Sequence, residues 1–354
     1  MKKALIVLLI LALAGGLFAQ DISFSGHIQT GMRIEILDGA DDIGVAANDD
    51  DAPVPIRADF TAAVDDGNWG AKIGFRADFD ALDGNHTYLH NAYGWLKPVD
   101  ILKISAGMID DGVWGTGGDY DGGVATGGGL RVEIIPIDGL NLGAFFSYPN
   151  GGIAAAKIGN FFGETAFGFE YKADIFYVSA AMKLYSEEST YPIGKDTDMK
   201  LIFGGGFTGI AGLTLRVSGG IEHLGNYSDD GWFDVREEAE FALSDVLKVG
   251  ILLAEGLTGP DGFCFFKVKP YVEFGVTDEF SVGADVGIVM GQANAPFEIA
   301  GKDSMGLASI FADIWAKYTI GGGWAKAGYG FTNYTKDYGD ALNHYIKLVF
   351  GWDF

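Results

Sequence analysis

The last thirteen residues of the chain alternate between apolar and polar side chains. Successive side chains of an extended strand point to opposite faces, so this alternation predicts a strand with one apolar and one polar face. A nearly continuous apolar face that ends in aromatic residues is typical of a strand between lipid and water. The apolar face carries Leu342, His344, Ile346, Leu348, Phe350, Trp352 and Phe354, and the opposite face carries Asn343, Tyr345, Lys347, Gly351 and Asp353.

The first nineteen residues have the pattern of a secretory signal peptide. Lys2 and Lys3 precede an apolar run from Ala4 to Leu13, and small residues lead to Ala19. The run is shorter than the roughly 20 residues that a transmembrane helix needs, and no second such run follows. We therefore expect a signal peptide over residues 1–19 and an exported mature protein over residues 20–354.

The composition favours an all-β protein and excludes several functions. Of the 354 residues, 55 are glycine and 14% are aromatic, which suits many strands joined by turns. The 48 acidic residues outnumber the 24 basic ones, so nucleic acid is not an expected partner. Cys264 is the single cysteine, and the sequence contains no redox or zinc motif, so no cofactor is expected.

Alternating segments recur along the mature chain, separated in turn by tight reversals and by longer connections. This asymmetry is typical of outer-membrane barrels, with short turns on one side and long loops on the other. The pattern predicts an all-β, transmembrane, antiparallel up-and-down β-barrel of about 16–18 strands. The expected short turns lie near residues 65–68, 97–100, 136–139, 172–174, 209–212, 244–246, 277–279 and 320–323. A soluble sandwich, propeller or solenoid is the alternative fold, but no fixed-period repeat supports it.

The face opposite to the apolar one carries most of the charged residues of the predicted strands. Because a charge on the lipid face costs roughly 2–4 kcal/mol at the bilayer midplane, these residues are expected to line a polar lumen. A barrel of this size holds an aqueous channel unless something fills it. The residues expected on this face include Arg33, Arg57, Asp59, Arg76, Asp78, Lys103, Arg131, Glu133, Arg216, Glu238, Asp285, Asp313 and Lys347.

The third long connection, residues 109–129, is rich in glycine and aspartate. With the whole mature chain, it resembles bacterial outer-membrane porins, whose third external loop folds inward and narrows the pore. The resemblance implies a constriction at which Asp110, Asp111, Asp119 and Asp121 face the wall residues Arg57, Arg76 and Arg131. An ordinary surface loop is the alternative. The Met-Lys-Lys start, the Gly15-Gly16 pair and the Phe24-Ser25-Gly26 segment are also similar to porin-like proteins of spirochaetes.

Together these features predict a bacterial outer-membrane channel, without enzyme activity, for passive diffusion of small hydrophilic solutes. Its excess of acidic residues predicts a modest preference for cations. Outer-membrane lipid is an expected contact, and the resemblance to porins implies a homotrimer.

Four other interpretations stay open at this point. The long loops could make the protein a surface adhesin or a purely structural barrel. Phe311 and Trp315 share a face with Asp313 and Lys317, and would form an aromatic track for sugars if that face is the inner one. His86, His90 and Asp83 could support a hydrolase. The acidic segment 38–51 could bind Ca²⁺, although its spacing is not that of an EF-hand.

Overall fold

The computed structural model describes residues 22–36, 43–46, 56–80, 84–109, 114, 127–148, 165–186, 197–226, 231–258, 262–291, 309–332 and 343–354. The expected signal peptide and the four loop aspartates at positions 110, 111, 119 and 121 lie outside these ranges. So do Asp83 and most of the acidic segment 38–51. What was predicted for them stays a prediction.

The described chain is almost entirely β-strand, with one 3₁₀-helix, η2 (Leu224–Asn226). Within the described ranges there is no helix long and apolar enough to cross a bilayer. The strands are β1 (Ile22–Ile36), β2 (Ile43–Ala46), β3 (Ile56–Asp65), β4 (Trp69–Asp80), β5 (Gly84–Val99), β6 (Leu102–Ile109), β7 (Gly127–Ile137), β8 (Leu140–Ser147), β9 (Thr165–Lys172), β10 (Phe176–Ser186), β11 (Thr197–Ile210), β12 (Leu213–Glu222), β13 (Trp232–Ala242), β14 (Leu247–Thr258), β15 (Gly262–Gly275), β16 (Phe280–Gly291), β17 (Ser309–Ile320), β18 (Gly323–Thr332) and β19 (Asn343–Asp353).

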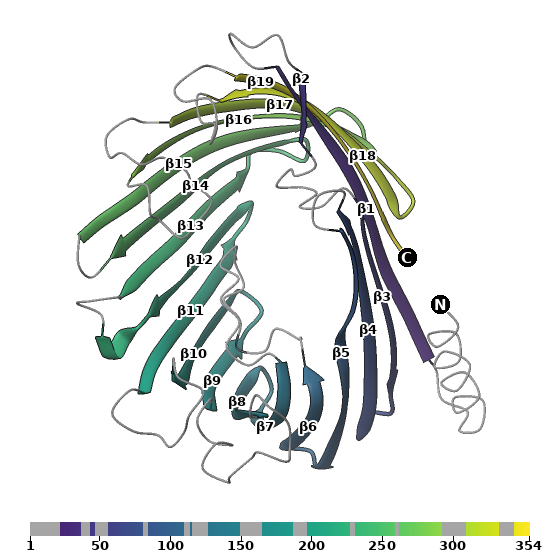
Figure 1. Ribbon diagram of the computed structural model, residues 1–354, viewed down its shortest axis with the longest axis vertical. Coiled ribbons are helices and arrows are strands. Elements are labelled where there is room, and N and C mark those ends of the chain that lie inside the picture. The colour runs from purple at the N-terminus through teal and green to yellow at the C-terminus, as the bar shows by residue number, and fades with distance from the viewer. Residues whose placement is uncertain are drawn as a thin grey trace.

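These strands form one antiparallel sheet that closes into a barrel (Figure 1). Long strands that follow one another in the sequence pair with each other, from β3 to β19. β1 closes the ring, because its first part pairs with β3 and its second part pairs with β19. The four-residue β2 pairs with the outer end of β1. The barrel wall therefore consists of eighteen long strands, and the prediction of an up-and-down barrel is confirmed at the upper end of its range.

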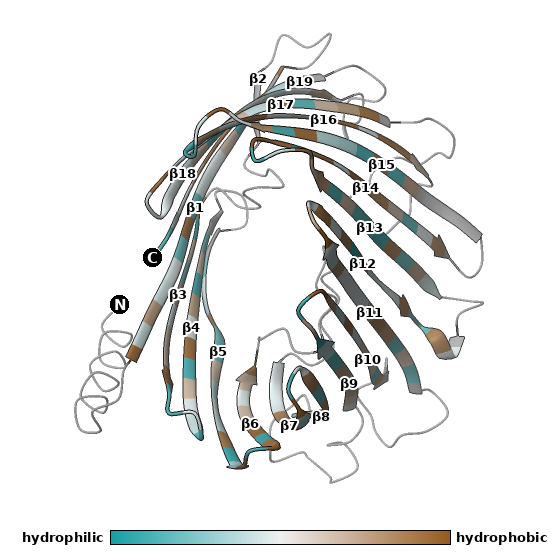
Figure 2. Ribbon diagram, turned by 180° about the vertical axis from the view of Figure 1, so that it is seen from behind, coloured by the Kyte–Doolittle hydropathy of each residue, from teal (hydrophilic) through white to brown (hydrophobic). Residues whose placement is uncertain are grey.

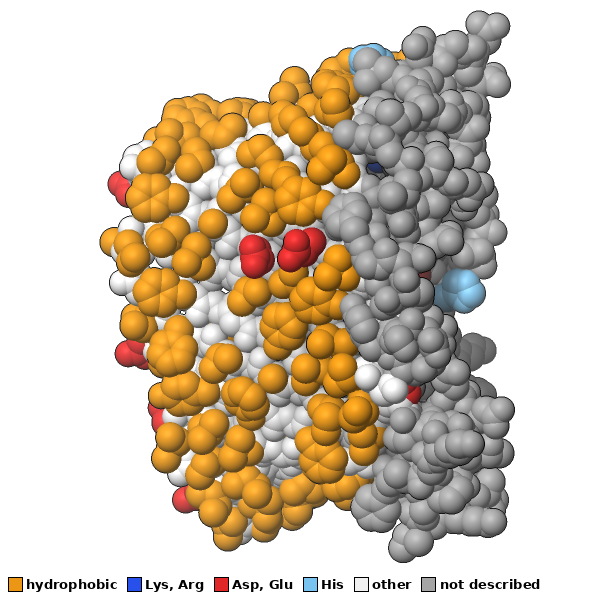
Figure 3. Space-filling model, turned by 90° about the vertical axis from the view of Figure 1, so that its left-hand side faces the viewer, with side chains coloured by type: hydrophobic (Ala, Val, Ile, Leu, Met, Phe, Trp, Pro, Cys, Tyr) orange, Lys and Arg blue, Asp and Glu red, His pale blue; other side chains and the backbone are white. Residues whose placement is uncertain are grey.

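The two faces of the sheet differ as the alternation predicts, which appears as alternating bands of hydropathy along the strands (Figure 2). In β19, Ile346, Phe350 and Trp352 are exposed on the outer face, whereas Tyr345 and Lys347 are buried on the inner one. The side of the barrel that Figure 3 shows is covered mostly with apolar side chains. A cylinder with this skin and a charged interior is suited to a membrane.

The short turns have the sequences that tight reversals require. In the turn between β3 and β4, Gly67 has a φ of +78°, which favours glycine, and its N–H donates to Oδ1 of Asp65 at 2.7 Å. The N–H of Asp66 donates to the carbonyl of Trp69 at 2.9 Å. This turn was predicted at the correct residues.

Two other strands run further than predicted. Pro98 and Pro136 were assigned to turns, but β5 continues to Val99 and β7 continues to Ile137. In both strands the pairing register shifts around the proline, between Leu96 and Val99 and between Ile134 and Ile137. Proline cannot donate to a ladder but is tolerated at such irregular positions, so it did not end the strand.

Candidate functional site

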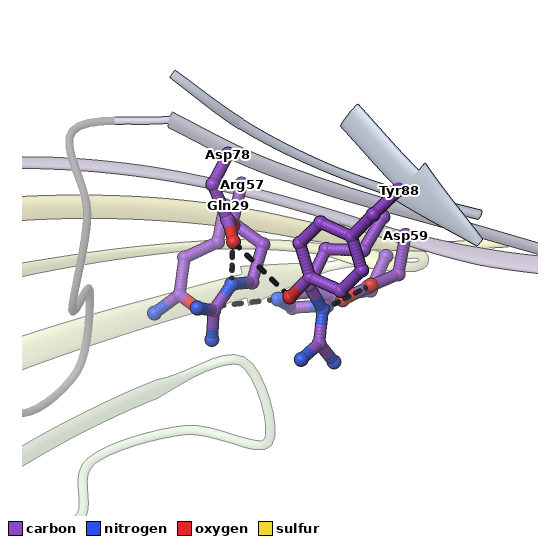
Figure 4. A network of polar contacts seen from close by, with 7 residues as sticks. Gln29, Arg57, Asp59, Asp78 and Tyr88 are labelled. Carbon is purple, nitrogen blue, oxygen red and sulfur yellow. Dashed lines mark hydrogen bonds and ion pairs between the residues drawn. The ribbon is translucent and has the colours of Figure 1, made fainter. Parts of the chain in front are cut away.

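The inner wall of the barrel carries the charged side chains, and many of them pair across neighbouring strands. On β3 and β4, Nε of Arg57 donates to Asp78 at 2.8 Å, and Nε of Arg76 donates to Asp59 at 2.6 Å. Positive and negative side chains therefore alternate both along and across the two strands, since each arginine lies directly opposite its aspartate. The hydroxyl of Tyr88 of β5 donates a hydrogen bond to Oδ2 of Asp78 at 3.4 Å (Figure 4). Two of the predicted wall residues, Arg57 and Arg76, are therefore held on the inner face and remain partly exposed there.

The third predicted wall residue, Arg131, is on the inner face but almost completely buried. Its Nε lies 3.1 Å from Oε2 of Glu133, and the two side chains are 1% and 2% exposed. Nδ2 of Asn141 donates to the other carboxylate oxygen of Glu133 at 2.7 Å. Lys103 lies 3.9 Å from the same carboxylate. A buried charge is stable only when it is paired in this way, so Arg131 belongs to a fixed structural network.

Trp114 covers this network. It is the one residue of the segment 110–126 that the structure describes, and it is fully buried. Its Nε1 donates to Oδ1 of Asn141 at 3.3 Å. A Cβ built on Gly143 or on Gly168 would lie 2.7 or 2.4 Å from a ring atom of Trp114. These glycines face inward, so the indole occupies a slot in the inner wall of β8 and β9 that only glycine leaves open.

The position of Trp114 bears directly on the third long connection. The chain leaves β6 at Ile109, and five residues later it is in contact with the inner wall rather than with the outer rim. The predicted constriction loop is therefore attached to the lumen wall at one described point. Sequence reasoning missed this residue, because a single tryptophan in a glycine-rich loop has no periodic context.

A second part of the inner wall, from β15 to β19, combines aromatic rings with lysines. Phe311 and Trp315 lie opposite Gly287 and Gly283, where a Cβ would approach the rings to 1.9 and 2.2 Å. The ammonium of Lys326 lies 5.2 Å from the ring centroid of Trp315, within cation–π range. The alternation of the strand places both rings in the lumen, because Ile310 and Ile314, which directly precede them in the sequence, are exposed on the outer face. The orientation that the sugar-track interpretation required is therefore present.

Acidic residues surround the end of the barrel at which the short turns lie. Figure 3 shows acidic side chains along its left-hand edge. All are exposed: Asp65, Asp66, Asp100, Asp138, Asp174, Asp245, Asp278, Glu279 and Asp353. The basic residues beside these turns are fewer: Lys97, Lys172 and Lys248. In bacterial barrels the short turns face the periplasm, so this acidic rim surrounds the periplasmic mouth.

The residues considered for catalysis do not form a site within the described part of the chain. His86 pairs in register with Asp78, and His90 lies at a bulge beside Gly74 with neither ring nitrogen hydrogen-bonded. Asp83, which the hydrolase interpretation pairs with them, lies outside the described ranges. Among the described residues, no group of three or more His, Cys, Asp and Glu is placed to hold a metal ion.

The whole fold is similar to that of solved bacterial outer-membrane porins. OccK11 (OpdR) of Pseudomonas aeruginosa matches with a TM-score of 0.58 at 11% identity, over 94% of this chain and 96% of that chain. OmpF of Salmonella typhi, solved as a complex with daunomycin, matches with a TM-score of 0.54 at 11% identity, over 95% of this chain and 98% of that chain. No family model matches the chain. No curated protein matches it significantly. At such low identity the likeness establishes the porin fold, and the spirochaete resemblance stays a prediction.

Proposed function

We propose that the protein is an outer-membrane channel through which small hydrophilic solutes diffuse passively. The observation that carries this proposal is the sorting of charge in a closed barrel of eighteen long strands. Every lysine and arginine of the described strands lies on an inward position, and barrels of this width hold an aqueous channel. The porin fold supports the same function.

The test is swelling of liposomes that contain the purified protein, in a series of neutral sugars of increasing size. A channel gives swelling that falls off above a size limit. A purely structural barrel, or an adhesin with a closed lumen, gives none at any size. Enzyme activity is not part of the proposal.

A modest preference for cations belongs to the proposal, and the acidic rim supports it. The carboxylates at the short turns outnumber the lysines there, which raises the local cation concentration at that mouth. Along the described strands, many basic side chains are paired with acidic ones. The cation preference is therefore expected to arise at the mouth. A reversal potential in a salt gradient that indicates anion selectivity would refute it.

The constriction also belongs to the proposal. Asp110, Asp111, Asp119 and Asp121 would face the basic wall residues across the lumen, and the contact of Trp114 with the inner wall supports an inward course for this segment. Replacing all four aspartates by asparagine should change single-channel selectivity. Unchanged selectivity and conductance would place these residues outside the pore.

A sugar-selective channel is the second candidate, because Phe311 and Trp315 face the lumen. Rings of this kind bind the apolar faces of sugars, and binding would appear as blockade of ion current by oligosaccharides. The inferred homotrimer is tested separately, by the mass of the protein in detergent.

A further inference from the structure

Two glutamates interrupt the apolar outer surface of the barrel. Glu237 lies near the middle of β13 and Glu255 lies in the outer part of β14, and both side chains are exposed. Glu237 pairs with Leu253, and Glu255 pairs with Val235, so the two carboxylates are diagonal neighbours on adjacent strands. Figure 3 shows two acidic side chains side by side within the apolar surface.

These glutamates are the only charged side chains at outward positions of the described strands. Their neighbours on that face are apolar, including Val217 opposite Glu237 and Phe266 opposite Glu255. A carboxylate in contact with lipid tails loses its hydration, and two adjacent carboxylates also repel each other. This face is therefore expected to have a cationic partner when it is embedded in a membrane.

An apolar groove of about 620 Å³ runs across the same outer face, from Phe169 of β9 to Leu253 of β14. Small residues form its floor, among them Gly205, where an added Cβ would meet only ordinary contacts at 3.4 Å or more. Phe203 and Phe207 flank the floor, and Glu237 is among the residues that line the groove. The volume is within the range of about 300–1,000 Å³ that is typical of small-molecule sites.

The described strands of a second copy of this chain would not supply the missing charge. The lysines and arginines of the described strands all lie on inward positions, so an outer wall docked against these glutamates would bring no cation. A lipid with a cationic headgroup supplies both components. Its acyl chain matches the apolar groove, and its ammonium group donates hydrogen bonds to carboxylates.

We propose that the outer face of β9–β14 binds a lipid with a primary-amine headgroup, of the phosphatidylethanolamine class. Its acyl chain lies in the groove, and its ammonium group lies against Glu237 and Glu255. This site goes beyond the channel function and requires only that the barrel is embedded in a membrane.

The test is native mass spectrometry of the delipidated protein with an equimolar mixture of phosphatidylethanolamine and phosphatidylglycerol that have identical acyl chains. The wild-type protein should retain phosphatidylethanolamine several-fold over phosphatidylglycerol. The double variant E237Q/E255Q should lose this preference, and the inward-facing control E273Q should keep it. Gly205→Leu, which fills the groove and leaves both glutamates in place, should reduce retention of both lipids.

Equal retention of the two lipids by the wild-type protein would overturn the proposal, as would an unchanged preference in E237Q/E255Q. A loss of oligomer mass in the double variant, without a change in lipid retention, would identify the occupant as a second copy instead. Because both glutamates face outward, conductance of the double variant should equal that of the wild type. Failure of the lipid site is thus distinguishable from failure of the channel.

Discussion

Removal of the Trp114 side chain should release the third long connection from the lumen wall. The indole is fully buried in a slot over Gly143 and Gly168 and donates to Asn141. Replacing a buried tryptophan by alanine typically costs about 3–5 kcal/mol. Since about 1.4 kcal/mol corresponds to a factor of ten, the undocked population of this segment should rise by roughly two to nearly four orders of magnitude.

The assay is single-channel recording of Trp114→Ala in planar bilayers. We expect a higher mean conductance and more current noise than in the wild type, because a segment attached to the inner wall becomes free to move. Trp69→Ala is the matched control. Trp69 is exposed on the outer face at the rim, so its loss should leave conductance and noise unchanged.

A second variant tests the same contact without changing the tryptophan. A Cβ at Gly168 would lie 2.4 Å from Cδ2 of Trp114, so Gly168→Ala should expel the ring and reproduce the alanine phenotype. Wild-type conductance and noise in both variants would refute the reasoning, because Trp114 would then hold no segment that shapes the pore.

Three further predictions concern the charges of the inner wall and its mouth. Glu133→Ala leaves Arg131 and Lys103 without their buried carboxylate and should destabilise the barrel by about 3–5 kcal/mol. The measurement is the denaturant concentration at the unfolding midpoint, which should fall. An unchanged midpoint would contradict the buried network. The double variant Asp59→Asn/Asp78→Asn leaves the positive charges of Arg57 and Arg76 without their partner carboxylates. The reversal potential should therefore shift toward anion selectivity. No shift would mean that these pairs lie outside the ion path. Raising the salt concentration from about 0.1 M to about 1 M shortens the Debye length from about 10 to about 3 Å. Ion selectivity that arises at the acidic rim should therefore weaken. Selectivity that does not change with salt would mean that it arises elsewhere in the protein.

Much of the fold was predictable because each strand lies between two different environments. The alternation in β19 identified its outer residues, and the Asp-Gly-Asn sequence identified the turn at Gly67. The strand count was predicted only as a range of about 16–18, since each strand carries a weak signal. Pro98 and Pro136 misled the placement of strand ends, because the sequence does not reveal the bulges that accommodate them.

The functional residues were only partly predictable. Arg57 and Arg76 were found because their parity places them on the polar face. The burial of Arg131 depends on contacts with β8 and the loop, which no local pattern records. Glu237 was detectable in principle, since it lies between the inward residues Arg236 and Glu238 and must therefore face outward.

The most direct test of the whole account is the conductance and ion selectivity of the purified protein in a planar bilayer. A water-filled barrel with an acidic mouth predicts discrete ohmic steps and a reversal potential that favours cations in a salt gradient. Folded protein that inserts into the bilayer without conducting ions would contradict the open lumen on which the proposed function depends.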